Sequence, residues 1–198
     1  MSEKTHHLKA WELALLCALC LTLGAAAWAQ GRTEAIDGSL LRLHVLAVDD
    51  SEEEQALKLR VRDAVLAYLA PRLEAAKSKE EAKAILSDSL AELTAAASAA
   101  SEGRPVAVTL MRERYPTRRY GDLSLPAGEY DSLRVILGKG EGRNWWCVVF
   151  PPLCTSLEST EELEQAVGED SFEILSADGA TSYRFRLLEL WGKLVSAF

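Results

Sequence analysis

Residues 40–65 have the sequence LLRLHVLAVDDSEEEQALKLRVRDAV, which contains the clearest passage in the chain from one secondary-structure element to the next. The first nine residues are rich in leucine and valine and predict a β-strand, in which Arg42 and His44 lie on a mixed second face. Ser51, with Glu54 three residues later, has the spacing of a helix-capping box. Apolar residues then recur at helical spacing. We therefore expect a strand that passes through an acidic turn into a helix.

The rest of the chain supplies further elements of both kinds. Pro71 should kink or end the first helix. Capping signals, composition and periodicity predict more helices over residues 79–100, 160–167 and 183–198, although the last also alternates like a strand. Apolar, β-favouring runs predict more strands over residues 106–113, 133–137 and 145–150. The expected order is β-α-α-β-β-β-α-α, an α+β domain whose mixed sheet is covered by helices.

Three connecting stretches lack strong periodicity. Residues 138–144 are glycine-rich and separate two β-favouring runs, so we expect a β-hairpin there. Residues 115–130 contain two prolines and two glycines and are expected to form turns. Residues 171–181 are expected to be irregular or weakly extended.

Composition excludes several classes of protein. The chain has 198 residues, of which 48% are hydrophobic and 26% charged, values that fit one globular domain. A single long apolar run excludes a polytopic membrane protein. The formal net charge of −8 argues against a nucleic-acid partner, because nucleic-acid binders carry a basic surface.

The N-terminus has the pattern of a secretory signal peptide. Lys4 and Lys9 precede an uncharged run over residues 13–29, which ends in Ala-Trp-Ala. An uncleaved membrane anchor is the alternative, although the run is slightly short for a span, and a cytosolic helix is a third. The expected organisation is a leader over residues 1–29, a linker over residues 30–39 and an exported domain over residues 40–198.

The exported part contains few side chains that could act as nucleophiles, bases or metal ligands. The leader holds two of the three histidines and two of the four cysteines, which leaves His44, Cys147 and Cys154. His44 lies in a predicted strand with no nucleophile motif nearby, so a structural role is expected. One histidine and a C-x6-C pair do not match a zinc site, and no metal or cofactor is expected.

Carboxylates offer the other route to catalysis. Asp49 and Asp50 begin an acidic run that helix capping largely explains, with partner recognition as the alternative. A cell-envelope hydrolase could use these two residues or Asp122 as acid and base.

Two side-chain pairs stand out near residue 150. Trp145 and Trp146 are neighbours in a predicted strand, so they should point to opposite faces, and one of them could be an exposed interface residue unless helices bury both. Cys147 and Cys154 are expected to form a disulfide in an exported protein, with two buried free thiols as the alternative.

Three segments together are similar to a known family. They are LRLHVLAVDDSEEEQALKLRVRDAV from residue 41, YGDLSLPAGEY from residue 120 and GEGRNWWCVVFPPLC from residue 140. They resemble stage II sporulation protein R of endospore-forming bacteria. The resemblance implies export from the forespore into the space between forespore and mother cell. It also implies activation of a membrane-embedded aspartic protease of the mother cell, which then processes a sigma-factor precursor.

The sequence therefore predicts a secreted or membrane-anchored protein ligand rather than an enzyme. The carboxylate hydrolase and a passive envelope scaffold are the alternatives. If the leader is uncleaved, it would contact the membrane. The candidate partner-binding residues are Asp50, Tyr120, Tyr130, Arg143, Trp145 and Trp146.

Overall fold

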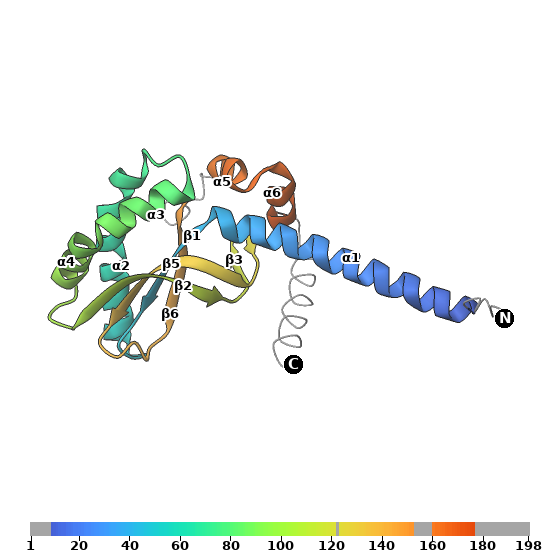
Figure 1. Cartoon of the computed structure of the whole chain (residues 1–198). Coiled ribbons are helices and arrows are strands. Elements are labelled where there is room, and N and C mark those ends of the chain that lie inside the picture. Colours follow the sequence, from blue (N-terminus) through green and yellow to red (C-terminus); the bar gives the residue numbers. More distant parts are fainter. Residues whose placement is uncertain (1–8, 122, 153–159, 177–198) are drawn as a thin grey trace, which may run out of the picture.

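The computed structural model describes residues 9–121, 123–152 and 160–176, which form one α+β domain with a long N-terminal helix (Figure 1). The helices are α1 (Ala10–Ser39), α2 (Glu52–Leu73), α3 (Lys79–Asp88), α4 (Leu90–Ala100), α5 (Thr160–Val167) and α6 (Glu169–Ser176). The strands are β1 (Leu41–Leu46), β2 (Val106–Tyr115), β3 (Arg118–Tyr120), β4 (Leu123–Leu125), β5 (Gly128–Leu137) and β6 (Asn144–Phe150). The α+β class, the single domain and the mixed sheet are confirmed.

The main sheet has the strand order β2-β5-β1-β6. Strand β1 is parallel to β5 and antiparallel to β6, so it separates the two strands that were predicted to form a hairpin. That hairpin prediction is wrong. The connection crosses the end of β1, where Glu141 and Gly142 donate backbone hydrogen bonds to the carbonyls of Val48 and Ala47. A side chain at Gly142 would overlap the Asp49 carbonyl, so glycine permits this crossing.

Helices α2, α3 and α4 cover one face of the sheet (Figure 1). Alternate residues of β1, including Leu41, Leu43 and Val45, pack there against apolar residues of the three helices. The side chain of Ser51 caps α2 by accepting a hydrogen bond from the Glu54 amide (3.3 Å), as predicted. The chain departs from the prediction at Ser89, which divides the expected helix over residues 79–100 into α3 and α4.

A second, smaller apolar cluster lies on the other face. It joins the last turn of α1, the short β3–β4 hairpin, α5 and α6 to the sheet. Two expectations need correction here. The predicted linker over residues 30–39 is helical, because Ile36 and Leu40 are buried in this cluster. Residues 171–176 also belong to helix α6, in which Leu175 is buried, rather than to an irregular segment.

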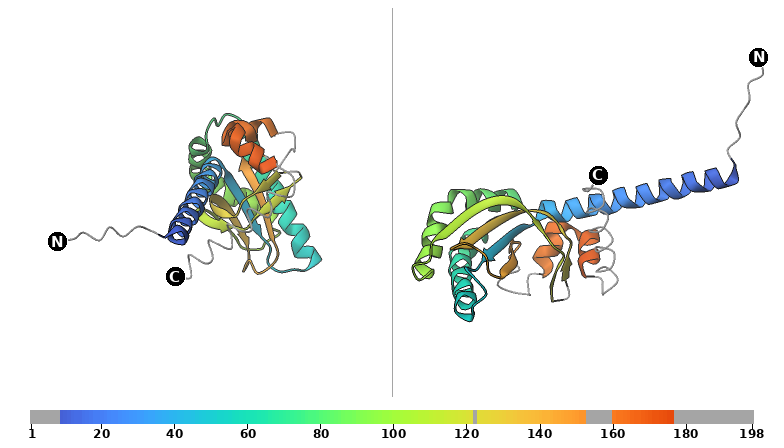
Figure 2. Two further views of the ribbon diagram at one scale, coloured as in Figure 1. Left: turned by 90° about the vertical axis from the view of Figure 1, so that its right-hand side faces the viewer. Right: turned by 90° about the horizontal axis from the view of Figure 1, so that it is seen from below.

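The long helix α1 extends from this cluster away from the sheet (Figure 2). Its large apolar side chains between residues 11 and 23 are exposed. Within the described residues, none of the helices combines the length and the apolar character that a membrane crossing requires. The helix predicted over residues 183–198 and the cysteine at position 154 lie outside the described residues, as does Asp122.

Candidate partner-binding site

Trp145 and Trp146 lie on β6, which is one of the two edge strands of the sheet. Because successive side chains of a strand point to opposite faces, Trp145 packs beside the helical core and Trp146 beside the second cluster. Both side chains are half-buried, so neither is the freely exposed residue that was one of the expectations. Neither indole N–H has a hydrogen-bond partner among the described residues.

On the helical side, Trp145 is bordered by charged residues. The guanidinium of Arg62 lies over its ring, 4.3 Å from the centroid. Two residues before Trp145, the backbone amide of Arg143 donates a hydrogen bond to a carboxylate oxygen of Asp50 (2.7 Å). Lys58 donates to the carbonyl of Arg143 (2.8 Å), and burial, followed by the nearby Arg143 charge, lowers the pKa of Lys58. The structure thus brings together two of the candidates, Asp50 and Arg143, two residues before the third, Trp145.

On the opposite face, Trp146 stacks on His44, with 3.6 Å between ring centroids. The Tyr120 hydroxyl donates to the Trp146 carbonyl (3.1 Å) and accepts a hydrogen bond from Arg42 (2.7 Å). The guanidinium of Arg118 lies 5.8 Å from the centre of the indole. Tyr120 and Trp146 therefore form a second group, separated from the first by the thickness of the strand.

His44 belongs to a hydrogen-bonded network on this face. Its Nδ1 lies 3.1 Å from a carboxylate oxygen of Glu113, which also accepts a hydrogen bond from Ser132 (2.6 Å). Burial raises the pKa of Glu113, but the hydrogen bonds from His44 and Ser132 outweigh it, so that the pKa is lowered overall. The Tyr115 hydroxyl lies 2.7 Å from Ser132. Sequence reasoning missed Glu113 and Ser132, because their link to His44 depends on strand pairing.

This network is not arranged for nucleophilic catalysis. A catalytic serine donates its proton to a histidine, whereas Ser132 donates to the carboxylate. Ser132 is fully buried and the His44 side chain is only 5% exposed, so a substrate has no access to either. The expected structural role of His44 agrees with this geometry.

Arg42 is the largest fully buried side chain on the same face. Its guanidinium lies 4.2 Å from the ring centre of Tyr115 and 4.9 Å from that of Tyr130, and its Nε donates to the Cys147 carbonyl. Tyr130 has no exposed surface, so the structure places this candidate in the core rather than at a partner-binding surface. Its hydroxyl donates to the Pro126 carbonyl (2.8 Å).

Asp49 and Asp50, the two candidate carboxylates that the structure describes, occupy a turn instead of a pocket. Asp49 is exposed, and hydrogen bonds from Ser51 lower its pKa. A general acid requires a raised pKa, so this environment does not favour acid catalysis. Asp50 is also exposed and is held by Arg143. No cluster of three or more possible metal-ligating side chains occurs in the described part of the chain.

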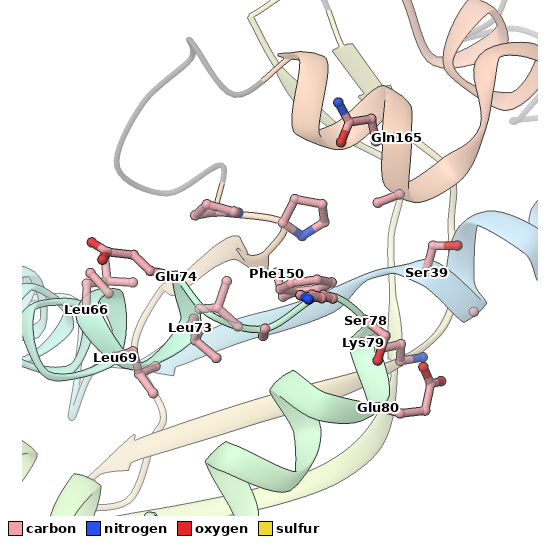
Figure 3. Close-up of a pocket in the computed structure, with 18 residues that line it drawn as sticks. Ser39, Leu66, Leu69, Leu73, Glu74, Ser78, Lys79, Glu80, Phe150 and Gln165 are labelled. Carbon is pink, nitrogen blue, oxygen red and sulfur yellow. The ribbon is translucent and has the colours of Figure 1, made fainter.

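A cavity of about 800 Å³ lies elsewhere, between the end of α2, the start of α3, the end of β6 and α5. Figure 3 shows Leu66, Leu69 and Leu73 of α2 along one side, with Phe150 facing them and Gln165 of α5 beyond it. None of the six candidate residues lines this cavity. The cavity is therefore separate from both tryptophan environments.

Comparison with known proteins gives the relationship of the chain. The family model of stage II sporulation protein R matches residues 37–160, which include all six candidate residues. Stage II sporulation protein R from Bacillus subtilis (strain 168) is 38% identical over 123 residues, which are 60% of this chain and 55% of that relative. No solved structure matches the chain. The matched region covers most of the described domain, and the chain belongs to the stage II sporulation protein R family.

Proposed function

We propose that this protein is an exported sporulation signal that activates a membrane-embedded aspartic protease by binding it. Family membership supports a role in sporulation. Export through the leader, action in the space between forespore and mother cell, and processing of a sigma-factor precursor are parts of the same proposal. In it, the protein acts as a ligand, and the bond-breaking chemistry belongs to the protease.

The observation that carries the proposal is the pair of tryptophans on the edge strand β6. Tryptophan and arginine dominate the energy of protein interfaces, and each indole here has an arginine over its ring. Both indole N–H groups lie buried without an acceptor among the described residues. Because these two nitrogens are buried, a partner would contact the partly exposed rings and the arginines beside them rather than the N–H groups. We call Trp145, Trp146, Arg62 and Arg118 the tryptophan surface.

Activation by binding sets an energetic requirement. A ligand shifts a protease from inactive to active only by binding the active conformation more tightly. A shift from 1:99 to 99:1 requires a preference of about 5.5 kcal/mol. Three interface residues with effects of about 2 kcal/mol each can supply such a preference.

Reconstitution of the signalling step tests the proposal. The full chain is co-expressed with the protease and the sigma-factor precursor in a bacterium that does not form spores, and the processed fraction of the precursor is measured. Trp145→Ala should abolish processing while the protein is still exported. Trp146→Phe keeps an aromatic ring on His44 and should reduce processing less.

Tyr68→Ala is the matched control, because Tyr68 on α2 also carries an arginine over its ring but lies outside the tryptophan surface. It should leave processing unchanged. Full processing by a stable Trp145→Ala protein would refute the role of this surface. Processing that needs no added chain at all would refute the ligand proposal itself. Loss of processing in a stable, protease-binding His44→Ala protein would favour an enzyme instead.

A further inference from the structure

The opposite edge of the sheet carries a concentration of positive charge. Four of the eight residues from Arg112 to Arg119 are arginine, in a chain whose formal net charge is −8. All four are exposed: Arg112, Arg114, Arg118 and Arg119. Only Arg112 and Arg114 lie on the edge strand β2, whereas Arg118 and Arg119 lie on β3, and Arg118 is the arginine over Trp146. None of the four forms an ion pair within the described residues, and Arg112 donates only to the Glu129 carbonyl (3.3 Å). A partner at this edge would therefore meet the guanidiniums of Arg112 and Arg114.

The same edge has unused main-chain groups. Strand β2 pairs with β5 along ten residues and has no strand on its other side. The Pro105 carbonyl accepts a hydrogen bond from Gly138, on the β5 side. Because inward and outward main-chain groups alternate in an antiparallel pair, the N–H and C=O groups of alternate residues from Val106 to Arg114 point outward. No hydrogen bond from another described residue reaches these outward groups.

The two observations coincide at one end of the strand. Arg112 and Arg114 are two residues apart, so they share a face, and by the same alternation their own main-chain groups are among those that point outward. A strand added at this edge would place every second side chain beside these guanidiniums. Carboxylates at those positions would meet arginine at cross-strand distance.

We propose that β2, with its two arginines Arg112 and Arg114, forms a docking surface for an extended acidic polypeptide segment, which adds to the sheet as a fifth strand. Main-chain hydrogen bonds would supply affinity, and the arginines would select acidic side chains. The β2 edge of a second copy is not such a segment, because its strand carries arginines rather than alternating carboxylates. The proposal concerns a different edge from the tryptophan surface and does not depend on the proposed function.

A defined peptide tests the surface. The probe is a blocked, fluorescent octapeptide that alternates glutamate with threonine and valine, and its binding to the full chain is measured by anisotropy. It should bind, and hydrogen exchange should slow in β2 and not in β6. A lysine version of the peptide should not bind. An acidic peptide with N-methyl groups on alternate residues should lose binding at least tenfold, because it cannot complete the ladder.

Matched variants separate this surface from general electrostatics. Arg112→Glu with Arg114→Glu should weaken binding of the acidic peptide at least tenfold. Lys139→Glu is the control, because it also reverses a positive charge, at an exposed residue beyond the far end of β5. It should change the affinity for the acidic peptide less than twofold. Arg112→Gln with Arg114→Gln provides a milder change if the charge-reversed protein does not fold.

Three results would overturn the proposal. Equal binding of the N-methylated peptide would mean that attraction is purely electrostatic. Binding to phosphatidylglycerol vesicles without binding to the peptide would assign the arginines to a membrane surface. Self-association of the arginine variants, together with undiminished peptide binding, would mean that the arginines only protect the edge from aggregation.

Discussion

Asp37 provides the most quantitative test of how α1 is joined to the domain. Its carboxylate is 8% exposed in the last turn of α1 and packs against Gly128, where even a Cβ atom would overlap it. Burial raises the pKa of Asp37 to about 6, although a hydrogen bond with Tyr130 and the charges of Arg112 and Lys79 oppose the rise. The ionised carboxylate is therefore poorly accommodated at neutral pH.

The consequence for stability follows from proton linkage. Between the ordinary pKa of 3.8 and about 6, the folded state binds more protons than the unfolded state. Below pH 3.8 the carboxyl is protonated in both states and does not destabilise the fold. As the pH rises from 3.8 to about 6, the free energy of unfolding falls, and above about 6 it levels off. At about 1.36 kcal/mol per pKa unit, the loss amounts to about 3 kcal/mol.

Asp37→Asn removes this titration while it keeps the shape of the side chain. At pH 7.5 the variant should be more stable than the wild type by up to about 3 kcal/mol, and near pH 4 the difference should vanish. The assay is urea unfolding of both proteins at pH 4, 5, 6 and 7.5, followed by tryptophan fluorescence. Asp88→Asn, at an exposed residue of α3, controls for the loss of one carboxylate. Parallel curves for the wild type and Asp37→Asn would refute the reasoning.

Three other predictions follow from the structure and the sequence. Gly142→Ala should lower the free energy of unfolding by about 1–3 kcal/mol, because its Cβ would overlap the Asp49 carbonyl. Urea unfolding measures the change, and an unchanged midpoint would contradict the close approach of Gly142 to the end of β1. Alkylation of exported protein without reduction should leave Cys147 and Cys154 unlabelled by mass spectrometry, and Cys147→Ser should cost about 2–3 kcal/mol, whereas full labelling would exclude the disulfide. N-terminal sequencing of exported protein should begin at Gln30, while full-length exported protein would indicate an anchor.

The strand and helix of residues 40–65 could be predicted because their signals are local. Alternation, the Ser51 cap and helical periodicity each depend on residues a few positions apart. Sheet order could not be predicted in this way. Two β-favouring runs around a glycine-rich loop satisfy the local pattern of a hairpin, but the loop bonds instead to Ala47 and Val48 at the end of β1. That preference comes from residues about ninety positions away.

The candidate site was predictable to the extent that strand geometry decides it. The opposite directions of Trp145 and Trp146 follow from the period of a strand. The burial of Tyr130 does not, because it depends on Arg42, Ile36 and the β3–β4 hairpin, which meet only in the folded domain. The four arginines in residues 112–119 are a signal in the sequence, but only the structure shows that two of them, Arg112 and Arg114, lie on an edge strand.

Binding and stability are coupled differently at the two edges of the sheet. Trp146 stacks on His44 and its carbonyl is bonded by Tyr120, so a change there disturbs the buried network as well as any interface. Arg114 and Arg119 are both exposed, and neither forms an ion pair with another described residue. A loss of function at β6 therefore requires a stability measurement before it can be assigned to binding. On β2 the same caution applies to Arg112, whose charge acts on the buried carboxyl of Asp37. Charge reversal at Arg114 does not carry this ambiguity and is the cleaner way to find a surface that binds a partner.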